Sequence, residues 1–158
     1  MKELLIKTTH YALVRPWSFV VNCLYWIINF KKYRKTKIDI AIIKVEIESE
    51  EDVISKMKTF RWRKDAFIDW IPWIKTIVAR NLQDDCDGAA VLAKWMLDWV
   101  GIEADLVVLY GHPCHMVCVT KDRKLMISNE EGVYLDPENW EKEVLDHFMG
   151  RYDRVVVL

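Results

Sequence analysis

Apolar positions in the middle of the chain recur with the spacing of an α-helix. Between residues 86 and 99 they include Val91, Leu92, Trp95, Met96 and Trp99. This spacing places them on one face of a helix, which predicts that the face belongs to the core. An aspartate just before the helix (84 or 85) can cap its first backbone N–H groups, and a glycine at 101 stands where a C-terminal stop belongs. The pattern therefore predicts a central helix that begins near a cysteine, Cys86.

Short apolar runs downstream of this helix are typical of strands. The segments are 104–110, 111–119, 124–129 and 133–137, with a loop over 130–132, a helix over 137–148 and a last strand over 154–158. Helices come first along the chain and neighbouring strands come later. This order favours an α+β fold in which an antiparallel sheet packs on the central helix.

Three different patterns precede the central helix. Isoleucines alternate over 38–47 with one change of phase, which predicts a strand with a bulge. The segment Ser49–Asp52 has the composition of a capping box and predicts a short helix that ends near Phe60. Pro72 suits the first turn of a further helix, which we expect to run to about Asn81.

The first 37 residues differ from residues 38–158, which we interpret as one domain. Residues 17–30 are almost entirely apolar, and residues 31–37 contain five basic side chains. The apolar run is shorter than the roughly 20 residues of a bilayer span, and it has no signal-peptide cleavage pattern. We expect a helix that packs on the domain or on a second copy. An interfacial helix on an anionic membrane or another acidic surface, or a tilted span, are the alternatives.

Length, charge and cysteine content limit the function further. A chain of 158 residues can bury one core, and a formal net charge of −1 does not favour a nucleic-acid partner. The four cysteines are Cys23, Cys86, Cys114 and Cys118. Because no signal peptide precedes them, we expect a reducing, cytoplasmic compartment, with attachment to the periphery of a membrane as the alternative.

The segment 112–118 is rich in metal-ligand types, because it holds two histidines and two cysteines. In a regular strand, however, His115 lies on the opposite face from Cys114 and Cys118. The segment also lacks a Cys-x-x-Cys pair. We therefore expect neither a structural metal nor a cofactor.

A thiol, a base and an orienting group follow one another along the chain. Cys86 lies in the first helical turn, where the helix dipole favours the thiolate while the flanking aspartates oppose it. His115 shares a strand face with Val117 and Val119, and we expect this face to meet Cys86. A cysteine, a histidine and a polar residue on the next strand can act as nucleophile, base and orienter.

Three residues are candidates for the orienter of His115. If the hairpin after the His115 strand closes through three residues, Asn129 lies opposite His115, and this is the preferred assignment. If it closes through two or four residues, Ser128 takes that face instead. Asp136, before Pro137, is a further candidate.

These residues resemble the transglutaminase-like superfamily of cysteine enzymes, and most of all its small bacterial and phage cysteine-proteinase-like branch. The resemblance rests on Asp85–Asp87, the small-residue helix that ends in residues 99–104, the strand 115–119 and the following hairpin, and it covers about residues 60–140. It implies a papain-like core. It also implies that Cys86 is the nucleophile, that His115 takes its proton and returns it to the leaving amine, and that Asn129 orients His115.

The expected function is therefore amide hydrolysis or acyl transfer on a peptide or protein, through a thioester on Cys86. The oxyanion would be held by the Cys86 backbone N–H and a second donor, Gln83 or Trp70. The chain departs from the family around the cysteine: Asp84 replaces a glycine, Gly88 an acid and Ala89 an aromatic residue. These changes affect the groove wall and hence the substrate. The alternative is an inactive protein on the same fold that binds a peptide or partner and docks through its apolar N-terminal segment.

Overall fold

The computed structural model describes residues 15–64 and 71–158, and this part of the chain holds six helices and seven strands. The helices are α2 (Arg15–Ile28), α3 (Phe30–Glu46), α4 (Glu50–Met57), α5 (Ile74–Ala79), α6 (Cys86–Trp99) and α7 (Trp140–His147). The strands are β1 (Arg61–Trp62), β2 (Gln83–Asp84), β3 (Ala104–Gly111), β4 (His115–Thr120), β5 (Leu125–Ser128), β6 (Glu131–Tyr134) and β7 (Tyr152–Val157). None of the described helices is long and apolar enough to cross a membrane.

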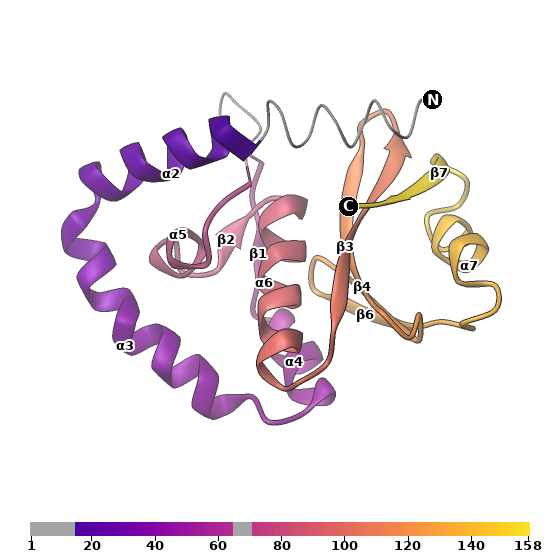
Figure 1. Ribbon diagram of the computed structural model, residues 1–158, viewed down its shortest axis with the longest axis horizontal. Coiled ribbons are helices and arrows are strands. Elements are labelled where there is room, and N and C mark those ends of the chain that lie inside the picture. The colour runs from indigo at the N-terminus through magenta and orange to yellow at the C-terminus, as the bar shows by residue number, and fades with distance from the viewer. Residues whose placement is uncertain (1–14, 65–70) are drawn as a thin grey trace.

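The main sheet has five strands in the order β6-β5-β4-β3-β7, and every neighbouring pair is antiparallel. Helix α6 covers one face of this sheet and α7 lies on the other side, as Figure 1 shows. Strands β1 and β2 form a separate parallel pair that leads into α6. The predicted α+β class, with an antiparallel sheet on the central helix, is thus confirmed.

Helix α6 has the expected ends, and of its predicted core residues Leu92 and Met96 are buried while Val91 and Trp95 pack against the core. The Asp85 side chain caps its start by accepting the Asp87 N–H, and Gly101 at its end has φ +82°. The buried side chains of α6 include three alanines, Ala89, Ala90 and Ala93, and three larger residues, Leu92, Met96 and Leu97. Trp99, predicted to be core, is instead exposed and donates its indole N–H to the Lys44 carbonyl at 3.2 Å. The alanines bring the α6 backbone close to the sheet, so the larger side chains lie to the side.

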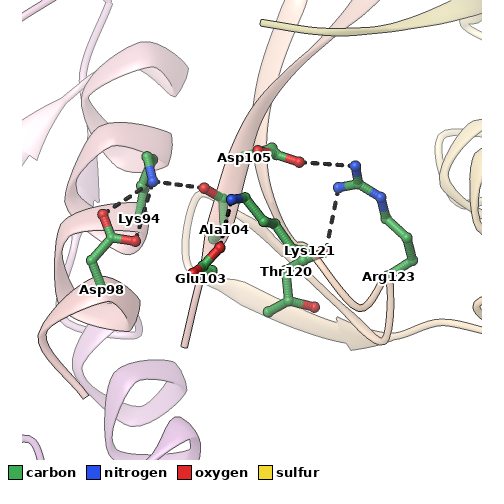
Figure 2. A network of polar contacts seen from close by, with 8 residues as sticks. All are labelled: Lys94, Asp98, Glu103, Ala104, Asp105, Thr120, Lys121 and Arg123. Carbon is green, nitrogen blue, oxygen red and sulfur yellow. Dashed lines mark hydrogen bonds and ion pairs between the residues drawn. The ribbon is translucent and has the colours of Figure 1, made fainter. Parts of the chain in front are cut away.

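A polar network fixes the far end of α6 to the hairpin of β3 and β4 (Figure 2). The Lys94 ammonium donates to the Asp98 carboxylate at 3.0 Å and to the Ala104 carbonyl at 2.6 Å. On the hairpin, Glu103 pairs with Lys121, and Asp105 pairs with Arg123 at 2.8 Å. Exposed pairs of this kind contribute little stability. The Lys94 bond to the first residue of β3 is the one that joins helix to sheet.

The segment 38–46 is helical, so the prediction of a bulged strand over 38–47 was wrong. It belongs to α3, which also runs through the division between residues 37 and 38. Thr36, Ile43 and Ile47 are buried and Ile40 packs on the core, with the four-and-three spacing of a helix face. The phase change in the isoleucine pattern therefore results from the helical repeat and does not mark a β-bulge.

The capping box before α4 is confirmed. Ser49 Oγ accepts the Asp52 N–H at 3.2 Å, and Asp52 Oδ2 accepts the Ser49 N–H at 3.0 Å. Pro72, by contrast, lies before the start of α5, because Trp73 is the N-cap. Residues 131 and 132, expected in a loop, belong to β6.

Candidate active site

Cys86 is the first residue of α6, and its side chain is half-buried. Its Sγ lies 3.7 Å from Asp87 Oδ1. Asp84 packs against Gly88 at the start of the helix. It is fully buried, and its carboxylate accepts a hydrogen bond from Arg80 Nη1 at 3.0 Å. A Cβ at Gly88 would lie 2.3 Å from Asp84 Cβ. Glycine at position 88 is therefore required by this close contact.

His115 lies at the start of β4 with one ring nitrogen engaged. Nε2 is 2.9 Å from Ser128 Oγ. Phe148 meets the imidazole edge-on at 5.2 Å between ring centroids, and Tyr152 stacks on it at 6.0 Å. Burial lowers the pKa of His115 to about 4, so the ring is neutral at pH 7. With Nε2 bonded to Ser128, Nδ1 is the nitrogen available to a thiol.

The hairpin after β4 closes through four residues, 121–124, and not through three. Cys118 pairs with Ile127 and Val119 with Met126, so Ser128 falls on the face of His115. Asn129 follows with φ +51°, and its Oδ1 is buried without a hydrogen-bond partner among the described residues. The group bonded to the imidazole is thus the Ser128 hydroxyl, and the expected placement of Asn129 opposite His115 was wrong.

Asp136 does not contact the imidazole either. It is exposed, and its carboxylate accepts the Glu138 N–H at 3.1 Å and the Asn139 side-chain amide at 2.8 Å. These bonds lower the pKa of Asp136. They assign this residue to the turn that leads into α7.

The strand parity of β4 was predicted correctly, but the face that meets α6 was not. Met116 and Cys118 pack on the α6 side, while Val117 and Val119 lie in the core beneath α7. The His115 ring is on this second side, with Phe148 and Tyr152. Burial against α6 raises the pKa of the Cys118 thiol to about 12. The expectation that His115 would face the central helix while Cys118 packs away from it was therefore wrong.

Cys86 and His115 nevertheless lie at the same end of the fold. Helix α6 turns directly into β3, so the two run in opposite directions and the start of α6 lies near the end of β3 (Figure 1). The start of β4 is at this end as well, because His115 pairs with Leu109. The thiol and the imidazole thus approach the end of the sheet from its two sides.

Tyr152, at the start of β7, lies near both groups. It pairs with Gly111 of β3 and stacks on His115. Burial raises the pKa of its phenol, and the negative charge on the thiolates of Cys86 and Cys114 raises it further. Sequence reasoning missed Tyr152, since only the pairing of β7 with β3 brings it to this end.

The remaining candidates contribute less. Gln83 lies in β2 opposite Arg61 and is half-buried, three residues before Cys86. Trp70 lies outside the described residues. Cys114 is exposed, with its Sγ 3.5 Å from the Gly111 carbonyl oxygen, and all four cysteines are free thiols.

One group of metal-ligand atoms comes together within the described ranges. Potential ligand atoms of Asp85, Cys86 and Asp87 all lie within 4.8 Å of one another. The Asp85 carboxylate already accepts the Asp87 N–H at 3.2 Å as the helix cap. These are three consecutive residues of a helix start, and their arrangement is explained by capping.

Comparisons of the chain with protein families, with curated proteins and with solved structures find no match.

Proposed function

We propose that this chain is a cysteine enzyme on a transglutaminase-like, papain-like core, and that it hydrolyses or transfers the acyl group of a peptide or protein amide. The observation that carries the proposal is the position of Tyr152. Its ring stacks on His115, and its phenol feels the charge of the Cys86 thiolate. Tyr152 is thus in ring contact with the imidazole and within electrostatic range of the thiol at one end of the sheet.

The hydrogen bond to Ser128 suits His115 to the role of base. When Nε2–H donates to Ser128 Oγ, the lone pair of Nδ1 is free to accept the thiol proton. The serine hydroxyl holds the ring in place, but unlike a carboxylate it can donate as well as accept, and it supplies no negative charge for the imidazolium. Since burial lowers the pKa of His115 to about 4, the imidazole is neutral at pH 7 and can accept a proton from Cys86.

The reaction then follows the usual course of thiol acyl transfer. Cys86 Sγ bonds to the amide carbonyl carbon while its proton passes to His115 Nδ1. The proton leaves with the amine as the C–N bond breaks, and a thioester remains on Cys86. Water or a second amine resolves the thioester. The Cys86 backbone N–H, at the start of α6, is placed to stabilise the oxyanion, with Gln83 as the second candidate donor.

The substrate must bind at the end of the sheet. Cys86 belongs to the core on the α6 side, whereas the rings around His115 belong to the core beneath α7. The thiol and Nδ1 can therefore meet only around the start of β4. In this proposal the scissile amide therefore lies between the start of α6 and Tyr152.

Alkylation of each cysteine by iodoacetamide, followed by mass spectrometry, tests the proposal. Cys86 is expected to react faster than Cys114, although Cys114 is the more exposed of the two thiols. His115→Ala should abolish this lead. His112→Ala, at an exposed histidine three residues away, should preserve it.

Two results would contradict the proposal. Cys86 could react no faster than Cys114, or its lead could survive in His115→Ala. Either result would leave the alternative, a binding protein without catalysis.

A further inference from the structure

The side of helix α2 that faces the rest of the protein carries buried polar side chains. Ser18 and Asn22 are 5 % and 0 % exposed. The Asn22 amide donates to the carbonyls of Ser18 at 2.7 Å and Ile71 at 3.0 Å. Its oxygen accepts the Trp73 N–H at 2.8 Å and the Thr76 hydroxyl at 2.9 Å. A satisfied buried amide thus docks α2 on the segment before α5, where an ordinary surface helix would use apolar side chains.

Large apolar side chains cover the outer side of α2. Seven of them are exposed: Trp17, Phe19, Val20, Leu24, Trp26, Ile27 and Ile28. We call this set the α2 apolar surface. At about 100° per residue these side chains cover more than half of the helix circumference, whereas a seam between two packed helices is narrower. An apolar surface of this kind marks an interaction site.

A basic segment follows the α2 apolar surface directly. Residues 31–37, at the start of α3, contain five lysines and arginines in a chain whose formal net charge is −1. Two tryptophans, Trp17 and Trp26, lie within α2 itself, and tryptophan favours the membrane interface. Apolar and aromatic residues next to a cluster of positive charge are typical of helices that bind anionic lipid.

The length of α2 determines how it can meet a membrane. Its 14 residues extend about 21 Å, against a hydrocarbon core of about 30 Å. The helix can therefore lie along a bilayer surface but cannot cross it. This orientation buries the α2 apolar surface among acyl chains and leaves Ser18 and Asn22 against the protein.

We propose that the α2 apolar surface, with the basic start of α3, binds the surface of an anionic lipid bilayer. A second copy of the chain fits less well, because a symmetric pairing of two α2 helices would bring the two basic segments together. It would also leave much of the wide apolar arc uncovered. The inference is independent of the chemistry proposed for Cys86.

Sedimentation of the full chain with lipid vesicles tests this proposal. We expect binding to vesicles of phosphatidylcholine mixed with phosphatidylglycerol, weak binding to phosphatidylcholine alone, and loss of binding as salt is raised. Ile28→Glu should weaken the partition coefficient by more than about tenfold. Met149→Glu is the matched control, because Met149 is even more exposed (89 % against 79 %) and lies outside the surface.

A pair of charge reversals tests the basic segment. Lys31→Glu combined with Lys32→Glu should weaken binding by more than about tenfold. Lys121→Glu combined with Lys124→Glu, in the hairpin between β4 and β5, should leave it unchanged. Thermal unfolding of each variant shows that it is folded, and Ile27→Glu replaces Ile28→Glu if the latter is not.

Three results would overturn the proposal. Equal partitioning into neutral and anionic vesicles would remove the role of charge. Equal loss of binding in the control variants would remove the role of this surface. The full chain could also fail to bind vesicles and form a dimer in solution. If Ile28→Glu dissociated this dimer, a second copy of the chain would be shown to cover α2.

Discussion

The bond between His115 and Ser128 sets the electrostatics of the candidate site. A buried imidazole with a neutral hydroxyl as its partner gains no charge stabilisation, and its pKa falls to about 4. A carboxylate at position 128 would have the opposite effect, because it would favour the imidazolium. The identity of this one side chain therefore decides whether the histidine rests as a neutral base or as a cation.

The free energy of unfolding should fall as the pH is lowered from about 6.5 to about 4. In this range the unfolded chain binds a proton at residue 115 and the folded chain does not, so acid favours unfolding by up to about 3 kcal/mol. His115→Gln should lose this part of the pH dependence, while His112→Gln should keep it. Urea unfolding at pH 7 and pH 4.5 measures the difference, and an unchanged difference in His115→Gln would show that the histidine is not buried as described.

The Ser128 hydroxyl should matter to Cys86 more than the Asn129 amide does. Ser128→Ala is expected to slow alkylation of Cys86 severalfold, because the imidazole loses the hydrogen bond that orients it. Asn129→Gly is the matched control, since it removes the amide and tolerates the positive φ at this position. Ser128→Asp should raise the His115 pKa, as measured by NMR titration. A larger effect from Asn129→Gly than from Ser128→Ala would restore Asn129 as the orienter.

At this scale the sequence could name the candidates but could not choose among them. Cys86 and His115 were found from their positions on a helix and a strand. The choice between Ser128 and Asn129 depends on whether the hairpin has three or four residues, and one residue of register reverses every side chain of a strand. The turn residues 121–124 do not fix this number.

At the scale of elements, the segments with clear end signals were the ones predicted well. Helix α6 has the Asp85 cap and Gly101, and α4 has its capping box. Helix α3 lacks a side-chain cap, and its isoleucines satisfy both an alternating and a helical pattern. Its tertiary contacts decide the outcome, because Ile43 and Ile47 are buried together on one helical face.

The start of α6 should be intolerant of any side chain at position 88. Gly88→Ala places a methyl group 2.3 Å from Asp84 Cβ, so we expect a loss of about 1–3 kcal/mol in the free energy of unfolding. Combining it with Asp84→Gly should give a loss smaller than the sum of the two single changes, because the second change removes the Cβ atom that the methyl group meets. Chemical denaturation of the four proteins measures this, and strict additivity would show that the two residues do not touch.

At the scale of the whole molecule, the sheet separates two cores, with α6 on one side and α7 on the other. The class of fold follows from the order of the elements. The side on which α6 packs does not, because β4 is apolar on both faces: Met116 and Cys118 on one, Val117 and Val119 on the other. A strand buried on both sides gives no signal of which face meets which helix.

Cys118 should report opening of the core between α6 and the sheet. Its thiol is fully buried and its pKa is raised to about 12, so the native protein should leave it unlabelled while Cys114 reacts. In urea the two cysteines should be labelled at similar rates. Mass spectrometry after a timed pulse of iodoacetamide makes the comparison, and native labelling of Cys118 at the Cys114 rate would contradict the packing of this core.

The inward polar side of α2 has a consequence for hydrogen exchange. The backbone amides of Ile71 and Trp73 lie outside any helix or strand, yet they donate to Ser18 Oγ and Asn22 Oδ1. Their protons are therefore protected only while α2 remains docked. Two slowly exchanging amides in an irregular segment, which become fast together when α2 detaches, would give a direct readout of how firmly this helix is held to the rest of the protein.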